Sequence, residues 1–229
     1  MTRGDWRDRD SSLVVFAESI RWLGVRWGMH RVHEGLRLAG FGGEFLYWPW
    51  HRVWRGWLVL PALMDRAMLE AQASRLAAFI VTRRRERPDR PIHLMGYSCG
   101  GYVTLRALEL LPPDSPVDSA VLLAAAVDPQ HDLTRAMASV RGRLVNVSSR
   151  LDFAILGLGT TLFGNAERLY RPSAGMTGLL HPSALDGRVV QVRWGAELIG
   201  EGYLGDHFSV SAPRFIAHRV APFMGLSGR

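Results

Sequence analysis

The feature that most constrains the fold is a repeated alternation between short apolar runs and longer segments with helical periodicity. Runs such as Ser119–Val127 (SAVLLAAAV) carry apolar residues on both faces of an extended chain, which is typical of strands buried within a parallel sheet. Strands that alternate with helices favour a three-layer α/β sandwich with a mostly parallel sheet. The six expected strands are Ser12–Glu18, Glu44–Trp50, Ile92–Tyr97, Ser119–Val127, Arg143–Ser148 and Arg188–Arg193.

Five segments between or after these strands have apolar residues at helical spacing. They are Arg21–Ala39, Met64–Arg84, Gly101–Leu111, Asp132–Val140 and Ala212–Phe223. The chain has 229 residues, which is enough to bury one full core. We expect a single domain over residues 1–229, in which the polar stretch 1–11 forms a flexible tail.

The composition excludes several classes of chemistry. All 28 basic residues are arginine, and the chain contains no lysine. A pyridoxal Schiff base, the usual phosphate-binding loop and a Ser–Lys dyad all need a lysine. The only cysteine is Cys99, so the sequence has neither an internal disulfide nor a zinc-type set of cysteines and histidines.

The charge pattern does not indicate nucleic-acid binding. The formal net charge is +7, but the arginines are scattered along the chain and only Arg83–Arg87 forms a run. Such a run is typical of a solvated turn. The longest apolar stretches, such as Trp57–Met64, are much shorter than the roughly 20 residues of a membrane-spanning helix. The amino terminus lacks the apolar core of a secretory signal, and we expect a cytoplasmic location.

A serine lies where the third expected strand becomes a helix. Residues 96–100 read Gly-Tyr-Ser-Cys-Gly, which fits the pattern G-x-S-x-G in the strand–turn–helix context that this pattern requires. A sharp turn of this kind forces the serine to a positive φ and crowds the residues two positions away on either side. Gly96 and Gly100 satisfy that crowding. Ser98 is therefore a candidate nucleophile, and the backbone N–H of Cys99 is a candidate donor to an oxyanion.

On this motif and its context the chain resembles the α/β-hydrolase superfamily, over about residues 12–225. The resemblance implies a triad in the order serine, acid, histidine. The matching acid is Asp152 in LVNVSSRLDF, and the matching histidine is His207 in GYLGDHFSV. Asp128, after the preceding strand, is the alternative acid. His181, before the last strand, is the alternative base.

The resemblance also places a second oxyanion donor after the first strand. In the superfamily a His-Gly pair is common at this place, but this chain reads VVFAESIRW, with neither His-Gly nor Gly-Gly. The N–H of Ala17 or Glu18 is the candidate donor. The carboxylate of Glu18 would weaken oxyanion binding unless it points away.

Two apolar stretches are candidates for a substrate pocket or lid, since the short connection after Ser119–Val127 leaves no room for a large cap domain. One runs from Tyr47 to Met64 and is rich in tryptophan, and the other runs from Phe153 to Gly164. Core packing is the competing interpretation of both. The residues assigned to this pocket are Tyr97, Trp48, Trp50, Trp54, Phe153 and Phe163.

These observations predict a serine hydrolase that cleaves carboxylic esters with an apolar acyl part through an acyl-enzyme. Lipid-like esters and thioesters are both candidate substrates, and no cofactor or metal is required. The alternative is a non-catalytic binding protein on the same fold that uses the tryptophan-rich surface of residues 47–64. Contact with a membrane surface through tryptophan and arginine is the least favoured of the three interpretations.

Overall fold

A computed structural model describes residues 12–18, 27–49 and 65–226 of the chain. Six strands in this part form one sheet, and every pair of neighbouring strands is parallel. The order is β2-β1-β3-β4-β5-β6. The strands are β1 (Leu13–Glu18), β2 (Glu44–Pro49), β3 (Ile92–Tyr97), β4 (Ser119–Leu123), β5 (Leu144–Ser148) and β6 (Val189–Arg193).

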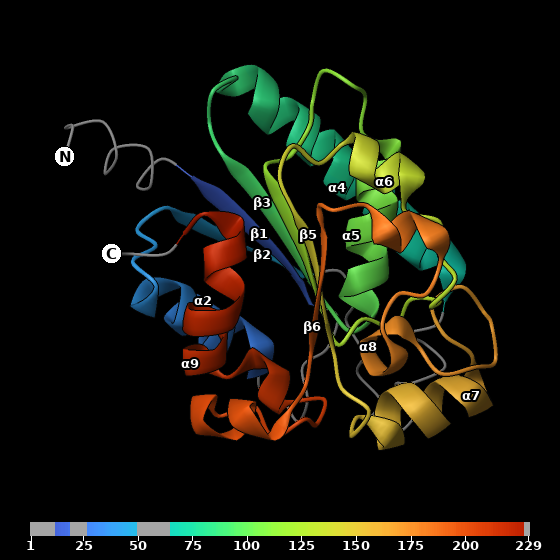
Figure 1. Ribbon diagram of the computed structural model, residues 1–229. Coiled ribbons are helices and arrows are strands. Elements are labelled where there is room, and N and C mark those ends of the chain that lie inside the picture. Colours follow the sequence, from blue (N-terminus) through green and yellow to red (C-terminus); the bar gives the residue numbers. More distant parts are fainter. Residues whose placement is uncertain (1–11, 19–26, 50–64, 227–229) are drawn as a thin grey trace.

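Helices cover both faces of this sheet, which confirms the expected three-layer architecture (Figure 1). One face carries α2 (Trp27–Leu38) and α9 (Pro213–Phe215). The other carries α4 (Arg66–Glu86), α5 (Cys99–Leu110) and α6 (Thr134–Ala138). Strands β1, β3, β4 and β5 are buried along their whole length, because apolar side chains on both of their faces pack against a helical layer.

Shorter helical segments fill the second half of the chain. After β5 come η1 (Phe153–Gly159), α7 (Thr160–Phe163), α8 (Ala174–Thr177) and η2 (Pro182–Leu185). After β6 come η3 (Ala196–Glu201) and η4 (Ser209–Ser211), and the chain beyond α9 continues as η5 (Ile216–Val220) and η6 (Ala221–Met224). None of the helices in the described part is long and apolar enough to cross a membrane.

Two expected elements differ from the sequence-based prediction. The fourth strand ends at Leu123 instead of Val127, because Ala124 has φ of 43° and turns the chain out of the sheet. The expected helix Ala212–Phe223 is divided into three short pieces, α9, η5 and η6. Pro222 lies in the first turn of the last piece. Because proline has no backbone N–H, it cannot donate the hydrogen bond that would continue the preceding helix. The tail expected at residues 1–11 lies outside the described residues.

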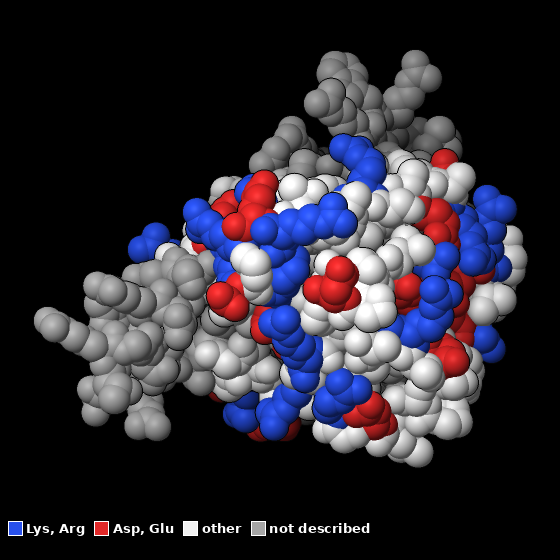
Figure 2. Space-filling view, turned by 90° about the horizontal axis from the view of Figure 1, so that it is seen from above, with Lys and Arg blue, Asp and Glu red and all other residues white. Residues whose placement is uncertain are grey.

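The end of the sheet at which the strands finish differs from the end at which they begin. The carboxyl ends of all six strands meet at the lower edge in Figure 1, where α7 and α8 also lie. The amino ends meet at the upper edge, and Figure 2 shows arginines interspersed with acidic side chains on that face. Ion pairs there join Arg84 to Asp118 and Arg188 to Asp186. In open parallel sheets ligands bind at the carboxyl edge, so the charged face lies away from the expected site.

Candidate active site

The turn between β3 and α5 holds Ser98 in a strained backbone conformation, with φ of 57° and ψ of −124°. A Cβ atom added to Gly96 would lie 2.3 Å from the carbonyl oxygen of Gly100. A Cβ atom added to Gly100 would lie 2.0 Å from the carbonyl oxygen of Ala17. The positive φ and the crowding expected from the motif are therefore confirmed. Only glycine fits at either position without a shift of the backbone.

The backbone of Ser98 is fixed by β4 and by the chain that follows it. Its N–H donates to the carbonyl of Leu123 at 3.0 Å, and its carbonyl accepts from the N–H of Ala126 at 3.0 Å. The next residue, Cys99, is the first residue of α5. The first N–H groups of a helix have no acceptor within that helix, so this helix end presents donors beside the serine hydroxyl.

Asp152 and His207 form a buried pair at the same edge of the sheet. Asp152 follows β5 and His207 lies in the loop before η4. The distance from Asp152 Oδ2 to His207 Nδ1 is 2.6 Å, and both side chains are at most 4% exposed. Because Nδ1 faces the carboxylate, Nε2 is the ring nitrogen left for another partner.

Tyr97, the residue before Ser98, joins the serine turn to the histidine loop. Its hydroxyl donates to the backbone carbonyl of His207 at 2.9 Å, and the two ring centroids are 5.1 Å apart. Burial is the main cause that raises the pKa of the Tyr97 phenol well above its usual value, so the hydroxyl keeps its proton. The histidine loop is also held from within, since the Asp206 carboxylate accepts from the N–H groups of Phe208 and Ser209.

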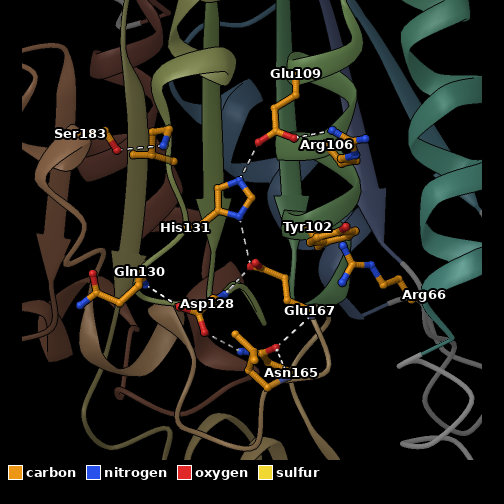
Figure 3. A network of polar contacts seen from close by, with 12 residues as sticks. Arg66, Tyr102, Arg106, Glu109, Asp128, Gln130, His131, Asn165, Glu167 and Ser183 are labelled. Carbon is orange, nitrogen blue, oxygen red and sulfur yellow. Dashed lines mark hydrogen bonds and ion pairs between the residues drawn. The ribbon is translucent and has the colours of Figure 1, made fainter.

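The alternative acid, Asp128, is committed to other partners. Its carboxylate pairs with Arg171 and accepts a hydrogen bond from the N–H of Gln130. The amide of Asn165 lies 3.4 Å from its second oxygen (Figure 3). Gln130 lies in the loop between β4 and α6, and Asn165 and Arg171 lie in the chain between α7 and α8. The acid that the structure brings to His207 is Asp152.

The alternative base and the other described histidines also have separate surroundings. His181 Nδ1 lies 2.8 Å from Ser183 Oγ, at the start of η2. His93 is a core residue whose Nδ1 lies 2.8 Å from Ser119 Oγ, and burial lowers its pKa to about 4. His33 stacks on Phe45 with centroids 4.7 Å apart. Among the described residues, no group of three or more histidine, cysteine or acidic side chains could hold a metal ion.

Comparison with known families gives a match to the serine aminopeptidases designated S33, a family of the α/β-hydrolase superfamily. The match spans residues 69–198, which is more than half of the chain and includes Ser98 and Asp152. The chain belongs to this family.

The hydrolase is also similar to solved structures of other proteins. A lipase-esterase related protein from Clostridium acetobutylicum is 10% identical, with a TM-score of 0.48 over 94% of this chain and 96% of the other. A cutinase-like protein from Cryptococcus sp. is 14% identical, with a TM-score of 0.40 over 95% and 96% of the two chains. The NocB thioesterase domain of the nocardicin cluster is 16% identical, with a TM-score of 0.39 over 94% of each chain. No curated protein matches the sequence.

The Glu18 carboxylate of the hydrolase is turned toward a helix end. Its two oxygens accept from the N–H groups of Gly28 at 2.9 Å and Met29 at 3.2 Å, in the first turn of α2. Negative charge is favoured at a helix amino terminus, which explains a buried glutamate at the end of β1. These two bonds hold the carboxylate against the first turn of α2 and compensate its negative charge there.

The residues expected to form a pocket or lid have different environments. Tyr97 is buried and contacts His207, so it supports the histidine loop and does not form an open pocket wall. Trp48 packs on Phe79 of α4 with ring centroids 5.4 Å apart, which favours the packing interpretation for this residue. Phe153 and Phe163 are exposed on η1 and α7. Trp50 and Trp54 lie outside the described residues.

One histidine that binds two carboxylates was not indicated by any pattern in the sequence. His131 lies between two glutamates, with Nε2 2.7 Å from Glu109 and Nδ1 3.2 Å from Glu167 (Figure 3). Burial alone would lower its pKa, but the hydrogen bonds to both carboxylates outweigh burial and raise the pKa to about 9. His131 thereby ties the chain after α7 to helix α5. The three residues are far apart in the sequence, so no local pattern could have revealed the contact.

Proposed function

We propose that this protein is a serine hydrolase that cleaves carboxylic esters through an acyl-enzyme. The observation that carries the proposal is the strained Ser98 turn together with the buried Asp152–His207 pair, which Tyr97 joins to that turn. Strained backbone at a serine and a buried acid–base pair both cost stability, and such features concentrate at functional sites.

The proposed reaction uses each of these groups in turn. Ser98 Oγ attacks the ester carbonyl while His207 Nε2 accepts the hydroxyl proton, and the alcohol then leaves with that proton. Asp152 holds the imidazole by Nδ1 and stabilises its charged form. Water attacks the acyl-enzyme by the same route, which releases the acid and restores the serine hydroxyl.

The developing oxyanion would be bound by backbone N–H groups. Cys99 N–H, at the start of α5, is the first donor, and the N–H of Ala17 or Glu18 is the second. The bonds from α2 to the Glu18 carboxylate support this assignment, because two N–H groups at a helix amino terminus compensate its negative charge. Cys99 itself is not a rival nucleophile, since burial raises the pKa of its thiol to about 12.

The proposed substrate has an apolar acyl chain. Apolar residues immediately flank the acid in the sequence, with Leu151 before Asp152 and Phe153 after it, and both are more than half exposed. Such surface at the edge of a site favours an apolar ligand. Esters and thioesters present the same acyl carbonyl, so both belong to the proposed class.

Hydrolysis of p-nitrophenyl esters of increasing acyl length tests the proposal. Ser98→Ala and His207→Ala are each expected to lower kcat/KM by about a thousandfold or more. The matched control is His181→Gln, which changes the alternative base and should leave kcat/KM within about twofold of the parent. Retention of the parent rate by Ser98→Ala, or loss of activity in the control alone, would overturn the assignment.

A further inference from the structure

The segment after Asp152 is apolar on its outward side as well as its inward side. Residues 153–164 (FAILGLGTTLFG) contain no charged side chain. Leu156, Gly157 and Thr160 are buried on the inward side of η1 and α7. The outward side exposes large apolar residues, namely Phe153 at 60%, Leu158 at 48%, Leu162 at 60% and Phe163 at 47%. A helix that is apolar all round is normally covered.

This outward surface continues onto the loops that carry the acid and the histidine. Leu151 and Leu204 are both more than half exposed. Their loops touch, because a Cβ atom at Gly205 would lie 2.9 Å from Leu151 Cδ1. We call the surface of Leu151, Phe153, Leu158, Leu162, Phe163 and Leu204 the outer apolar face. Helix α7 marks its position at the carboxyl edge of the sheet in Figure 1.

The charges around this face are positive. Arg150 and Arg168 are exposed, and within residues 65–226 neither has a carboxylate partner. The two acidic residues between positions 150 and 181 are turned inward, since Asp152 binds His207 and Glu167 binds His131 (Figure 3). Asp206, in the neighbouring loop, accepts from backbone N–H groups of its own loop.

An apolar surface bordered by arginines that have no carboxylate partner among the described residues fits an anionic lipid surface. Leucine and phenylalanine side chains enter the boundary of the acyl chains, and arginines on the rim contact lipid phosphates. A second copy of the chain fits less well, because a two-fold contact through this face would bring the arginines of both copies together with no carboxylate opposite them. The opposite edge of the sheet, with its paired charges, has the character of a solvated surface (Figure 2).

We propose that the outer apolar face is a docking surface for anionic lipid bilayers. Docking in this way turns the carboxyl edge of the sheet, and with it Ser98, toward the lipid. The proposal differs from the contact considered from the sequence, which relied on the tryptophan-rich stretch 47–64. It also stands independently of the proposed reaction, because it concerns adsorption to lipid and not cleavage.

Vesicle co-sedimentation of the full chain tests the proposal. The Ser98→Ala variant is used throughout, so that binding is measured without turnover. The vesicles contain phosphatidylcholine alone or with added phosphatidylglycerol. We expect the protein to sediment with the phosphatidylglycerol vesicles, to bind them less as salt is raised, and to bind phosphatidylcholine vesicles weakly.

Two sets of substitutions separate the apolar and charged parts of the face. The triple change Phe153→Ser, Leu162→Ser and Phe163→Ser should lower the partition coefficient at least about tenfold. The double change Arg150→Gln and Arg168→Gln should lower it about fivefold for each arginine removed. The matched controls are Leu185→Ser, an apolar residue that is 86% exposed on η2, and Arg135→Gln, an exposed arginine on α6. Both controls should bind as the parent does.

Several results would overturn the proposal. They are no sedimentation of the parent with either vesicle, equal binding to uncharged and anionic vesicles, and unchanged binding by the triple variant. Light scattering that shows a dimer in the absence of lipid, dissociated by the triple variant, would assign the face to a second copy. Thermal unfolding of each variant checks that these surface changes leave the fold intact.

Discussion

The hydroxyl of Tyr97 donates a hydrogen bond of 2.9 Å to the backbone carbonyl of His207. One residue thus links the turn that carries Ser98 to the loop that carries the proposed base, across 110 positions of the sequence. The two loops leave different strands of the sheet, and this bond fixes one against the other. A buried carbonyl that loses its donor costs about 1–3 kcal/mol. This bond therefore contributes both to the position of the histidine loop and to the stability of the fold.

Tyr97→Phe is expected to lower kcat for ester hydrolysis about tenfold with little change in KM, because the ring stays in place while the histidine loop loses its donor. The control is Tyr102→Phe, which removes a hydroxyl bonded to Glu70 at 2.6 Å on α4. Both variants should lose stability, but only Tyr97→Phe should lose kcat. Equal kcat values for the two variants would show that the Tyr97 hydroxyl has no positioning role.

Asp152→Asn and Asp128→Asn distinguish the two candidate acids. Asp152→Asn should lower kcat/KM by about a thousandfold or more, because an amide cannot stabilise the imidazolium. Asp128→Asn should act mainly on stability, since its carboxylate is buried and paired with Arg171. Kinetics and thermal unfolding of both variants provide the test. The opposite pattern of activity loss would transfer the role of acid to Asp128.

Gly100→Ala should prevent the turn from closing. The new methyl group would lie 2.0 Å from the Ala17 carbonyl oxygen, and a backbone atom cannot move aside as a flexible side chain can. We expect a loss of at least about 2 kcal/mol in the free energy of unfolding, together with loss of activity. Gly187→Ala is the matched control, because nothing lies within 4 Å of the added atom. Similar stabilities of the two variants would contradict the predicted close approach.

His131 should make stability depend on pH in the alkaline range. Its pKa is raised to about 9 in the folded protein, above an unfolded value of about 6.5. The protonated histidine therefore stabilises the folded protein by an amount on the order of 3 kcal/mol. This stabilisation is fully present below about pH 6.5 and is lost as the pH rises through about 9.

Urea unfolding of the parent and of His131→Gln between pH 6 and pH 10 provides the measurement, since glutamine keeps a polar group at this position without a charge that titrates. The advantage of the parent over the variant should shrink as pH rises. An advantage that is constant or that grows with pH would show that His131 is not held protonated between Glu109 and Glu167.

The sheet and the serine turn could be predicted because their signals are local. Apolar runs such as Ile92–Tyr97 specify buried strands, and the spacing of Gly96, Ser98 and Gly100 specifies the turn within five residues. The positions of Asp152 and His207 came from the order implied by the family resemblance, and the structure brings these two side chains together.

Contacts between distant segments could not be predicted in the same way. The run Arg83–Arg87 looked like a solvated turn, yet Arg84 is buried in α4 and donates to the carbonyls of Pro88, Arg90 and Pro116. The role of Glu18 depends on where α2 begins in space, and the state of His131 depends on Glu109 and Glu167. Sequence alone gives none of these distances.

Labelling with a fluorophosphonate probe, read by peptide mass spectrometry, tests the central claim most directly. The probe forms a stable adduct with a serine only when the hydroxyl is activated by a base. We predict one adduct, on Ser98, that disappears in His207→Ala and is strongly reduced in Asp152→Asn. A folded protein that gives no adduct, or an adduct on Ser98 that persists without His207, would contradict the proposed reaction.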